Sequence, residues 1–479
     1  MNILINKVNT NPNNESYIFD LATGYVNYAC FQDQFHNDVL ATDCLNKAIE
    51  YIEQLPIKTE YKIKLAECYL YLANFQNEIN NYQKAINIVK QYANDSDEAL
   101  GILSRAYEGL ARFQRSINSA KNYYAEAIII QTELLKKHPE YCPMVINTYT
   151  NYGIALEEIF SDYNSAKENY IKAIEYVTQW EPVTASDYHI CAMPYDHLAC
   201  LLRNKFHDYE GAVFYFNQEV IIRSKIPETV IENQRFIIQI YFSLAQINKF
   251  HIQNGYMAAI ENCDNAIRII EHLPENNRNS WMNEKLVTFY CSLGNIHIEQ
   301  EEYNQAVNNI ARAIQIMEKE RDNPGISPYN SANCYLILAE LHHYQLYDYE
   351  SAITYYHKVI EFGRLYQNDK GVQNEVIRAY NDIAILYANQ FNNHNSANEY
   401  WNNAIKIAKI NYPHLVDVFR SPLSEILFNC SQNKYEAAKS ILDKIKPLAA
   451  KCLADNPDDE CLKDLNVTIT KLLKKIQNA

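Results

Sequence analysis

The amino-acid sequence predicts an all-α protein, an α-solenoid of about ten stacked helical hairpins. Three observations predict this fold: a short phrase that recurs along the chain, apolar residues at helical spacing after each copy, and a scarcity of Gly and Pro. The chain has 479 residues, of which 48% are apolar, so it can bury a large core. Its 10 Gly and 14 Pro are few for a protein built on strands and tight turns.

The recurring phrase is a Tyr followed three residues later by an Ala. Its copies are Tyr82–Ala85, Tyr163–Ala166, Tyr209–Ala212, Tyr256–Ala259, Tyr303–Ala306, Tyr349–Ala352 and Tyr435–Ala438, with the variant His394–Ala397 and looser copies centred on Ala41 and Ala120. Successive alanines are 44, 35, 46, 46, 47, 47, 46, 45 and 41 residues apart. Such near-equal spacing indicates an internal structural repeat.

Each phrase is expected to open a helix, because apolar residues follow its Ala at four and seven positions. Tyr170 and Ala173 follow Ala166, and Ile310 and Ala313 follow Ala306. This spacing places the side chains on one face of an α-helix, whereas a strand would alternate every second residue.

A second helix is expected before each phrase, where a pair containing a small residue lies 12–14 positions before the Ala. The pairs are Leu72-Ala73, Tyr152-Gly153, Leu198-Ala199, Leu244-Ala245, Leu293-Gly294, Leu338-Ala339 and Ile383-Ala384. A small residue lets two helix backbones approach closely, so each unit is predicted to be a helical hairpin. The prolines are expected to fall between units, where they break no helix: Pro182, Pro194, Pro227, Pro274, Pro324, Pro328, Pro413 and Pro422.

In these features the chain resembles tetratricopeptide-repeat proteins. Leu293, Gly294, Ala306, Ile310 and Ala313 match the family pattern at its own spacing, whereas most other units have one or two more residues between the small residue and the Ala. The resemblance covers roughly residues 17–446 and implies a right-handed solenoid that binds proteins. The units run near 46 residues instead of 34, a lengthening similar to that of kinesin-light-chain-like repeats and bacterial peptide-sensing repeat proteins.

The two ends of the chain are expected to differ from the repeat array. Residues 1–16 are predicted to be a polar N-terminal extension, without the basic and apolar blocks of a signal peptide. Residues 447–479 are predicted to be a C-terminal capping helical segment, because Leu462, Leu465, Leu472 and Leu473 recur there with Lys between them.

Charge and cysteine usage exclude several classes of protein. The net charge is −15 and no basic run is present, so no nucleic-acid partner is expected. No apolar run approaches the roughly 20 residues that a membrane span needs. The 12 Cys are scattered singly, which favours buried thiols in a reducing, cytoplasmic location over a disulfide-stapled secreted domain.

Searches for catalytic, metal and cofactor motifs predict no catalytic residue, no metal and no cofactor, and hence no enzyme. No HExxH, GxSxG or Gly-rich phosphate loop is present. His342, His343 and His357 form the one His cluster, and adjacent helical positions point about 100° apart, which disfavours a shared metal. Cys191 with Cys200, and Cys452 with Cys461, are expected to be buried apolar residues.

Three functional hypotheses remain open, and the favoured one is a protein–protein interaction scaffold or adaptor. It would bind a peptide or a partner protein in the concave groove of the solenoid. The alternatives are a regulatory receptor for a short signalling peptide and an enzyme whose site the motifs do not reveal. The carboxylate clamp that binds chaperone tails is not expected, because Asn151 and Asn295 match it but its basic members are missing. The oligomeric state stays open.

The concave face is expected to be supplied by the first helices of the central units. Counting from each small-residue pair, the partner-binding positions are Arg203, Asn204, Gln246, Lys249, Asn295, Glu299, Glu340, His343 and Tyr344. These side chains are polar or amphipathic on helices whose other face is apolar, as the wall of a peptide-binding groove requires.

Overall fold

The computed structural model describes residues 2–33, 37–274, 277–319 and 327–411, together with 439, 442, 446, 469–471 and 474. The chain divides into two units, Met1–Ile240 and Tyr241–Ala479. Within the described residues every regular element is a helix. The predicted all-α class is therefore confirmed.

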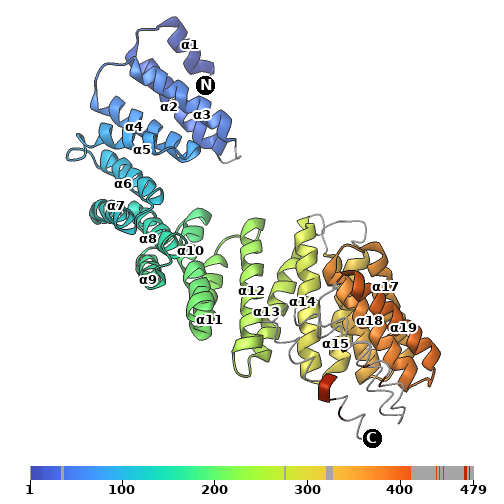
Figure 1. The fold of residues 1–479 in the computed structure, drawn as a ribbon. Coiled ribbons are helices and arrows are strands. Elements are labelled where there is room, and N and C mark those ends of the chain that lie inside the picture. Colours follow the sequence, from blue (N-terminus) through green and yellow to red (C-terminus); the bar gives the residue numbers. More distant parts are fainter. Residues whose placement is uncertain are drawn as a thin grey trace. The chain divides into compact units, whose positions relative to one another are not determined.

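Unit 1 is a succession of helices joined by short turns (Figure 1). In chain order they are α1 (Asn2–Thr10), α2 (Glu15–Asp33), α3 (Asp38–Glu53), α4 (Thr59–Gln76), α5 (Ile79–Val89), α6 (Asp97–Arg112), α7 (Ile117–Lys137), the 3₁₀ turn η1 (Pro139–Tyr141), α8 (Cys142–Glu158), α9 (Tyr163–Gln179), α10 (Ala185–Leu201), the π-helical turn η2 (Leu202–Phe206) and α11 (Tyr209–Arg223). The next helix, α12 (Ile231–His251), begins in unit 1 and ends in unit 2.

Unit 2 continues with the same kind of elements. They are α13 (Tyr256–His272), α14 (Ser280–Glu299), α15 (Tyr303–Lys319), α16 (Pro328–Glu340), the π-helical turn η4 (Leu341–Gln345), α17 (Tyr349–Leu365), α18 (Lys370–Asn389) and α19 (His394–Asn411). With 20 residues in α14 and 17 in α15, the extra length of the repeat lies mainly in its helices.

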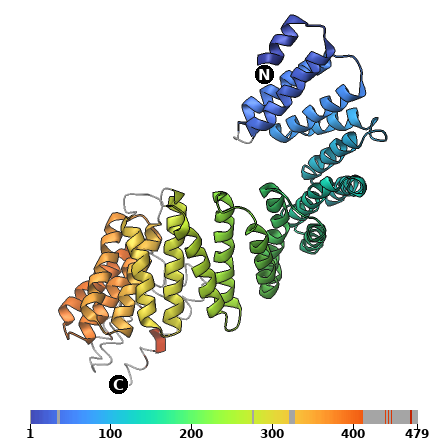
Figure 2. The ribbon, with the colours of Figure 1, turned by 180° about the vertical axis from the view of Figure 1, so that it is seen from behind.

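Consecutive helices pack as hairpins in both units. The pairs with the most extensive contact include α2 with α3, α8 with α9, α14 with α15, and α18 with α19, and the two views show such helices side by side (Figures 1 and 2). The first helices of neighbouring hairpins also contact one another, as α8 does with α10 and α16 with α18. The predicted hairpin repeat is therefore confirmed.

The repeat phrase forms the centre of each hairpin. Its described alanines are all fully buried: Ala41, Ala85, Ala120, Ala166, Ala212, Ala259, Ala306, Ala352 and Ala397. The side chain four residues later is buried in every copy, from Leu45 in α3 to Trp401 in α19. The copy at Ala438 and the C-terminal segment predicted for 447–479 lie outside the residues that the structure describes, apart from isolated positions.

Several second helices begin at the phrase after a capping residue, namely α9, α11, α17 and α19. Asp162, Asp208 and Asp348 each accept a hydrogen bond from the backbone N–H three residues on, at 3.2, 2.9 and 3.2 Å. Asn393 does the same for Ser396 at 3.1 Å. Such an N-cap satisfies a backbone donor that the helix leaves open, and replacing one by Ala costs typically about 1 kcal/mol.

The small residues of the first helices are needed for close packing. A Cβ placed on Gly153 would overlap the ring of Tyr170, and one placed on Gly294 would overlap Cδ1 of Ile310. Tyr170 and Ile310 are the residues four positions after the phrase Ala. The close approach predicted from the small-residue pairs is thus confirmed within both hairpins.

The longer interval in most units is taken up at the end of the first helix. There the backbone hydrogen bonds lengthen from four to six residues: Asp162 N–H to Leu156 C=O, Asp208 to Leu202, Asp348 to His342 and Asn393 to Tyr387. In the unit with the family spacing, Glu302 bonds five residues back, to His297. After α10 and α16, the π-helical turns η2 and η4 add a residue without displacing the phrase.

One proline departs from the expected placement between units. Pro194 lies inside α10, whereas Pro182, Pro227 and Pro274 lie between helices and Pro328 is the first residue of α16. Pro194 cannot donate to the carbonyl of Ile190, yet α10 continues, because Cys191, Tyr195 and Leu198 are buried on either side of it. Tertiary packing overrides the local preference here. Pro324, Pro413 and Pro422 lie outside the described residues.

The N-terminal extension is partly helical. α1 packs against α2, Val8 is buried between them, and the Lys7 ammonium lies 5.4 Å from the centre of the Tyr17 ring. Among the described residues, no helix is long and apolar enough to cross a membrane.

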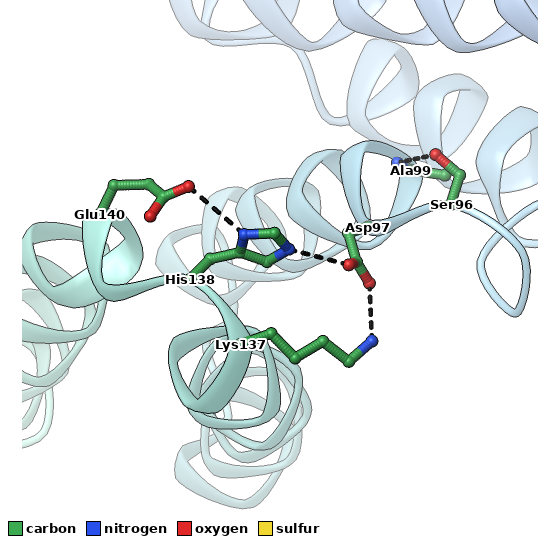
Figure 3. A network of polar contacts seen from close by, with 6 residues as sticks. All are labelled: Ser96, Asp97, Ala99, Lys137, His138 and Glu140. Atoms are coloured by element: carbon green, nitrogen blue, oxygen red, sulfur yellow. Dashed lines mark hydrogen bonds and ion pairs between the residues drawn. The ribbon is translucent and has the colours of Figure 1, made fainter.

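A surface network ties the start of α6 to the turn after α7 (Figure 3). The Asp97 carboxylate lies 3.0 Å from Lys137 Nζ and 3.0 Å from His138 Nε2, and His138 Nδ1 faces Glu140 Oε1 at 3.4 Å. Ser96 caps the same helix end by accepting from the Ala99 N–H at 3.2 Å. The network therefore joins the start of α6 to the end of α7, the two helices of one hairpin, on the solvent side.

The cysteines follow the expectation of free thiols with one exception. Cys44, Cys68, Cys142, Cys191, Cys200 and Cys263 are free thiols, most of them buried. Cys291 and Cys334, however, are joined by a disulfide between α14 and α16. No local pattern indicates this pairing, because the two residues are 43 positions apart and belong to different hairpins.

Candidate functional site

In unit 2 the first helices of two neighbouring hairpins border a polar cavity of about 340 Å³. It is lined by Glu340 at the end of α16, Tyr344 in η4, and Arg378, Asn381 and Asp382 on α18. A second cavity, next to Tyr335 and Phe362, has about 50 Å³, which suits a water molecule but not a side chain of a partner. The larger cavity is the candidate site.

Arg378 links the two helices that border the cavity. Its Nη2 lies 2.7 Å from Glu340 Oε1 across the interface, and its Nη1 lies 2.8 Å from Glu375 Oε2 on the same helix. Burial by itself would lower the pKa of the guanidinium, but the carboxylates of Glu340 and Glu375 raise it above its usual value. Arg378 is therefore a fixed cation with carboxylates on two sides.

Tyr344 forms an aromatic wall of the cavity. Its hydroxyl donates to Asp382 Oδ1 at 2.8 Å, and its ring stacks on His343 with 3.9 Å between centroids. Burial and the neighbouring Asp382 raise the pKa of the hydroxyl, so it stays protonated and keeps donating. The residue is still 43% exposed, so its ring is accessible to a partner.

His343 is not on the groove surface, so its predicted placement there is wrong. It is only 5% exposed, and its Nδ1 lies 3.1 Å from the Tyr356 hydroxyl. Burial lowers the pKa of His343 to about 4, so the ring is neutral near pH 7 and Nδ1 can accept from Tyr356. The prediction assumed an α-helical register, whereas Leu341–Gln345 runs as a π-helical turn that changes which side chains share a face.

Two other predicted residues are brought together as an ion pair. Lys249 Nζ on α12 lies 3.0 Å from Glu299 Oε1 at the end of α14. The Lys249 side chain is only 10% exposed, so it spans neighbouring first helices instead of projecting into solvent. Gln246 and Asn295, on the same two helices, are partly buried. Gln246, Lys249, Asn295 and Glu299 therefore lie where the two helices meet, and they line neither of the two cavities described above.

Arg203 and Asn204 belong to unit 1, in the π-helical turn η2. Arg203 Nε donates to Asn204 Oδ1 at 2.9 Å, and its guanidinium carbon lies 5.8 Å from the centre of the Phe216 ring. Asn204 is exposed and Arg203 is partly buried.

The sequence prediction missed three of the five cavity residues: Arg378, Asn381 and Asp382. They lie before the Ile383-Ala384 pair, whereas the predicted positions were counted only after each pair. Glu340 and Tyr344 are four residues apart, as are Arg378 and Asp382. Extending the helical spacing backwards along α18 would have found them.

The helix pairs and their buried phrase positions define the architecture as an all-α array of repeated helical hairpins. No family model matches the chain, and no curated protein matches it.

Among solved structures, the chain is similar to the apo form of RapI, with 14% identity and a TM-score of 0.44 over 79% of this chain and 99% of that one. It is also similar to the apo form of the quorum sensor NprR from B. thuringiensis, with 13% identity and a TM-score of 0.34 over 82% and 99%. A thermophilic TPR protein from Thermus thermophilus has 15% identity and a TM-score of 0.27 over 42% and 90%. These likenesses are weak, and the architecture is assigned from the helix pairs themselves.

Proposed function

We propose that this chain is a non-enzymatic scaffold that binds a peptide or an extended segment of a partner protein through the first helices of unit 2. The observation that carries the proposal is the cavity between α16–η4 and α18. Its lining combines an accessible aromatic ring, an amide and ionised groups, a mixture that suits the backbone and side chains of a peptide.

The arrangement of the charged groups supports binding more than catalysis. Arg378 is already paired with two carboxylates, and Asp382 accepts from Tyr344, so the polar groups are held in place before a ligand arrives. Such preorganisation lowers the entropy lost on binding. Glu340, Tyr344, Arg378, Asn381 and Asp382 are the proposed contacts.

The proposal is tested by comparing two tyrosines of the same segment. Tyr344→Ala removes the cavity wall, whereas Tyr347→Ala removes a tyrosine that is 68% exposed and does not line the cavity. The ligand is a peptide selected from a random display library against the unmodified chain, with its Kd measured by titration calorimetry. We expect Tyr344→Ala to weaken binding about tenfold or more, as for an aromatic anchor, and Tyr347→Ala to leave Kd within about twofold.

Equal Kd values for both variants, with intact helical circular dichroism, would show that the cavity is not the binding site. Capture from native lysate then separates the two binding roles. Recovery of a stable protein partner supports a scaffold, whereas recovery of short peptides alone supports a receptor for a signalling peptide.

A further inference from the structure

Two consecutive first helices of unit 2 are joined covalently. Cys291 on α14 and Cys334 on α16 form a disulfide whose Cα atoms are 6.6 Å apart. The bond closes a loop of 43 residues that contains the whole of α15. It therefore connects one hairpin directly to the next.

The bond lies where non-covalent contact between the two first helices is small. α14 packs mainly on α15, and α16 packs mainly on α17, while α14 and α16 touch each other over a short stretch. A disulfide restricts the ensemble of conformations open to the chain, and the restriction matters most where few other contacts do the same. The disulfide is therefore the main direct link between α14 and α16, beside the packing of α15 against both helices.

The two cysteines of the disulfide differ in burial. Cys334 is fully buried in the apolar cluster that includes Leu336 and Leu338, whereas Cys291 is only partly buried at the margin of that cluster. A small dithiol can therefore attack the sulfur of Cys291, which makes Cys334 the leaving group.

The buried free thiols of the described residues do not compete for this bond. Burial raises the pKa of Cys142 to about 11, and raises the pKa of Cys191 and of Cys263 to about 12. Only a thiolate attacks a disulfide, so these groups stay protonated and inert near pH 7. Cys430, Cys452 and Cys461 lie outside the described residues.

We propose that the Cys291–Cys334 disulfide is a reversible redox staple, and that its reduction loosens the α16–η4 segment. That segment carries Glu340 and Tyr344, so the redox state would also act on ligand binding, a consequence that rests on the proposed function. In the reduction, one thiolate of an external dithiol bonds to the Cys291 sulfur, and the S–S bond breaks. Cys334 leaves with the electron pair and takes a proton.

The second thiolate of the dithiol then attacks the mixed disulfide and releases Cys291, which also takes a proton. Two electrons pass to the protein, and the dithiol becomes a cyclic disulfide. Oxidation by a small disulfide such as oxidised glutathione reverses the steps.

The test compares the oxidised chain with the chain reduced by dithiothreitol, without any ligand. Mass spectrometry after alkylation assigns the state of each cysteine, and hydrogen exchange reports local opening. We expect amides of α16 and η4 to exchange at least about tenfold faster after reduction, while those of α8 and α9 in unit 1 do not change. Cys291→Ala should exchange like the reduced chain with or without dithiothreitol, and Cys263→Ala, which removes a buried free thiol, should keep the response.

Two results would overturn the proposal. One is that Cys291 and Cys334 are both alkylated in the unreduced chain, and are also alkylated in a second sample that is treated with oxidised glutathione before the alkylating reagent is added. The other is equal exchange of α16 and η4 in the two redox states of the unmodified chain, a comparison that needs no variant to fold. Because no ligand takes part, failure of the proposed binding function leaves this result unchanged.

Discussion

The hairpins α10/α11 and α14/α15 carry the same repeat phrase but differ in the chemistry of their cores. In α15 the phrase is followed at four and seven positions by Ile310 and Ala313, both fully buried in an apolar cluster. In α11 the corresponding residues are Phe216 and Glu219, and Glu219 is only 1% exposed. A carboxyl group therefore occupies a position where the other hairpin has a methyl group.

The α10/α11 hairpin accommodates Glu219 by supplying a buried cation from the same helix. Arg223, 2% exposed, donates from Nε to Glu219 Oε1 at 2.6 Å. The guanidinium carbon also lies 4.3 Å from the centre of the Phe236 ring, and Nη1 lies 3.3 Å from His189 Nδ1. Burial raises the pKa of Glu219 to about 8, with a contribution from Asp196 and against the effect of Arg223.

The two hairpins together show that the phrase determines where the helices lie but not what chemistry their interface contains. The side-chain sizes of the phrase residues and their helical spacing are enough to give α11 and α15 the same position within their hairpins. A buried charge is tolerated only because a partner four residues on lies on the same face. Substitutions in each hairpin test this contrast.

The largest effect is expected from Glu219→Ala, which leaves Arg223 buried without its acceptor. We expect the free energy of unfolding to fall by about 3 kcal/mol or more, because a buried charged donor loses its hydrogen-bond acceptor. Urea denaturation followed by circular dichroism measures it. In Glu219→Ala combined with Arg223→Met, most of the loss should be recovered, because no charge remains buried.

Glu219→Gln, which keeps an acceptor but cannot ionise, tests the protonation state. The pKa of Glu219 is raised in the folded chain, so its favourable contribution is fully present below its ordinary value of 4.5 and is lost as the pH rises through about 8. The unmodified chain should therefore lose stability relative to Glu219→Gln between about pH 4.5 and pH 8, with no further change at higher pH. A constant difference over that range, or a cost below about 1 kcal/mol for Glu219→Ala, would contradict the role of the pair.

A smaller effect is expected from Gly294→Ala in the apolar hairpin. The added Cβ would overlap Cδ1 of Ile310, so α14 and α15 must shift apart or Ile310 must change its rotamer. Overpacking of this kind costs about 1–3 kcal/mol. Ile310→Val removes Cδ1, so it should relieve part of the cost in the double variant, as a double-mutant cycle would show. In α10 the same position is already Ala199, and Ala199→Gly should cost about 1 kcal/mol for the opposite reason.

The hairpins could be predicted from the sequence because every copy of the phrase repeats the same physical requirement. Ala306 must be small, and Ile310 must lie on the face that meets Gly294. Glu219 escaped prediction because a single departure from the phrase does not show whether the helix has rotated or a partner has been supplied. His343 was misplaced because the sequence does not show where an α-helix becomes a π-helical turn.

The cavity residues and the disulfide depend on pairing between hairpins, and the sequence constrains that pairing less than it constrains each hairpin. Glu340 was predicted from its own helix, whereas Arg378, with which it forms an ion pair, is 38 residues further on. Cys291 and Cys334 are likewise matched only by how α14 meets α16. Register between helices is decided by the sum of many side-chain volumes, not by a local motif.

The smallest effect is expected where charges meet in solvent. Asp97→Asn removes the centre of the surface network at the start of α6 (Figure 3), but Ser96 still caps the helix through the Ala99 N–H. Exposed ion pairs contribute little because water and salt screen them. The shift in melting temperature near pH 7 should therefore be much smaller than that of Glu219→Ala or Gly294→Ala.

The contribution of Asp97 to stability should depend on pH with the opposite sign to that of Glu219. Hydrogen bonds from His138 and then Lys137 hold the pKa of Asp97 below its usual value of 3.8. A lowered pKa means that the contribution of Asp97 is present above that usual value and is lost as the pH falls through the folded-state pKa. Melting curves of the unmodified chain and of Asp97→Asn should therefore differ slightly at pH 5–7 and converge towards pH 2, and raising the salt concentration at pH 7 should also bring them together. Two results would show that this network does not act as an exposed ion pair: a larger difference between the two chains at pH 2 than at pH 7, or a difference that salt leaves unchanged. In either case the contrast between buried and exposed charge would not hold for this repeat.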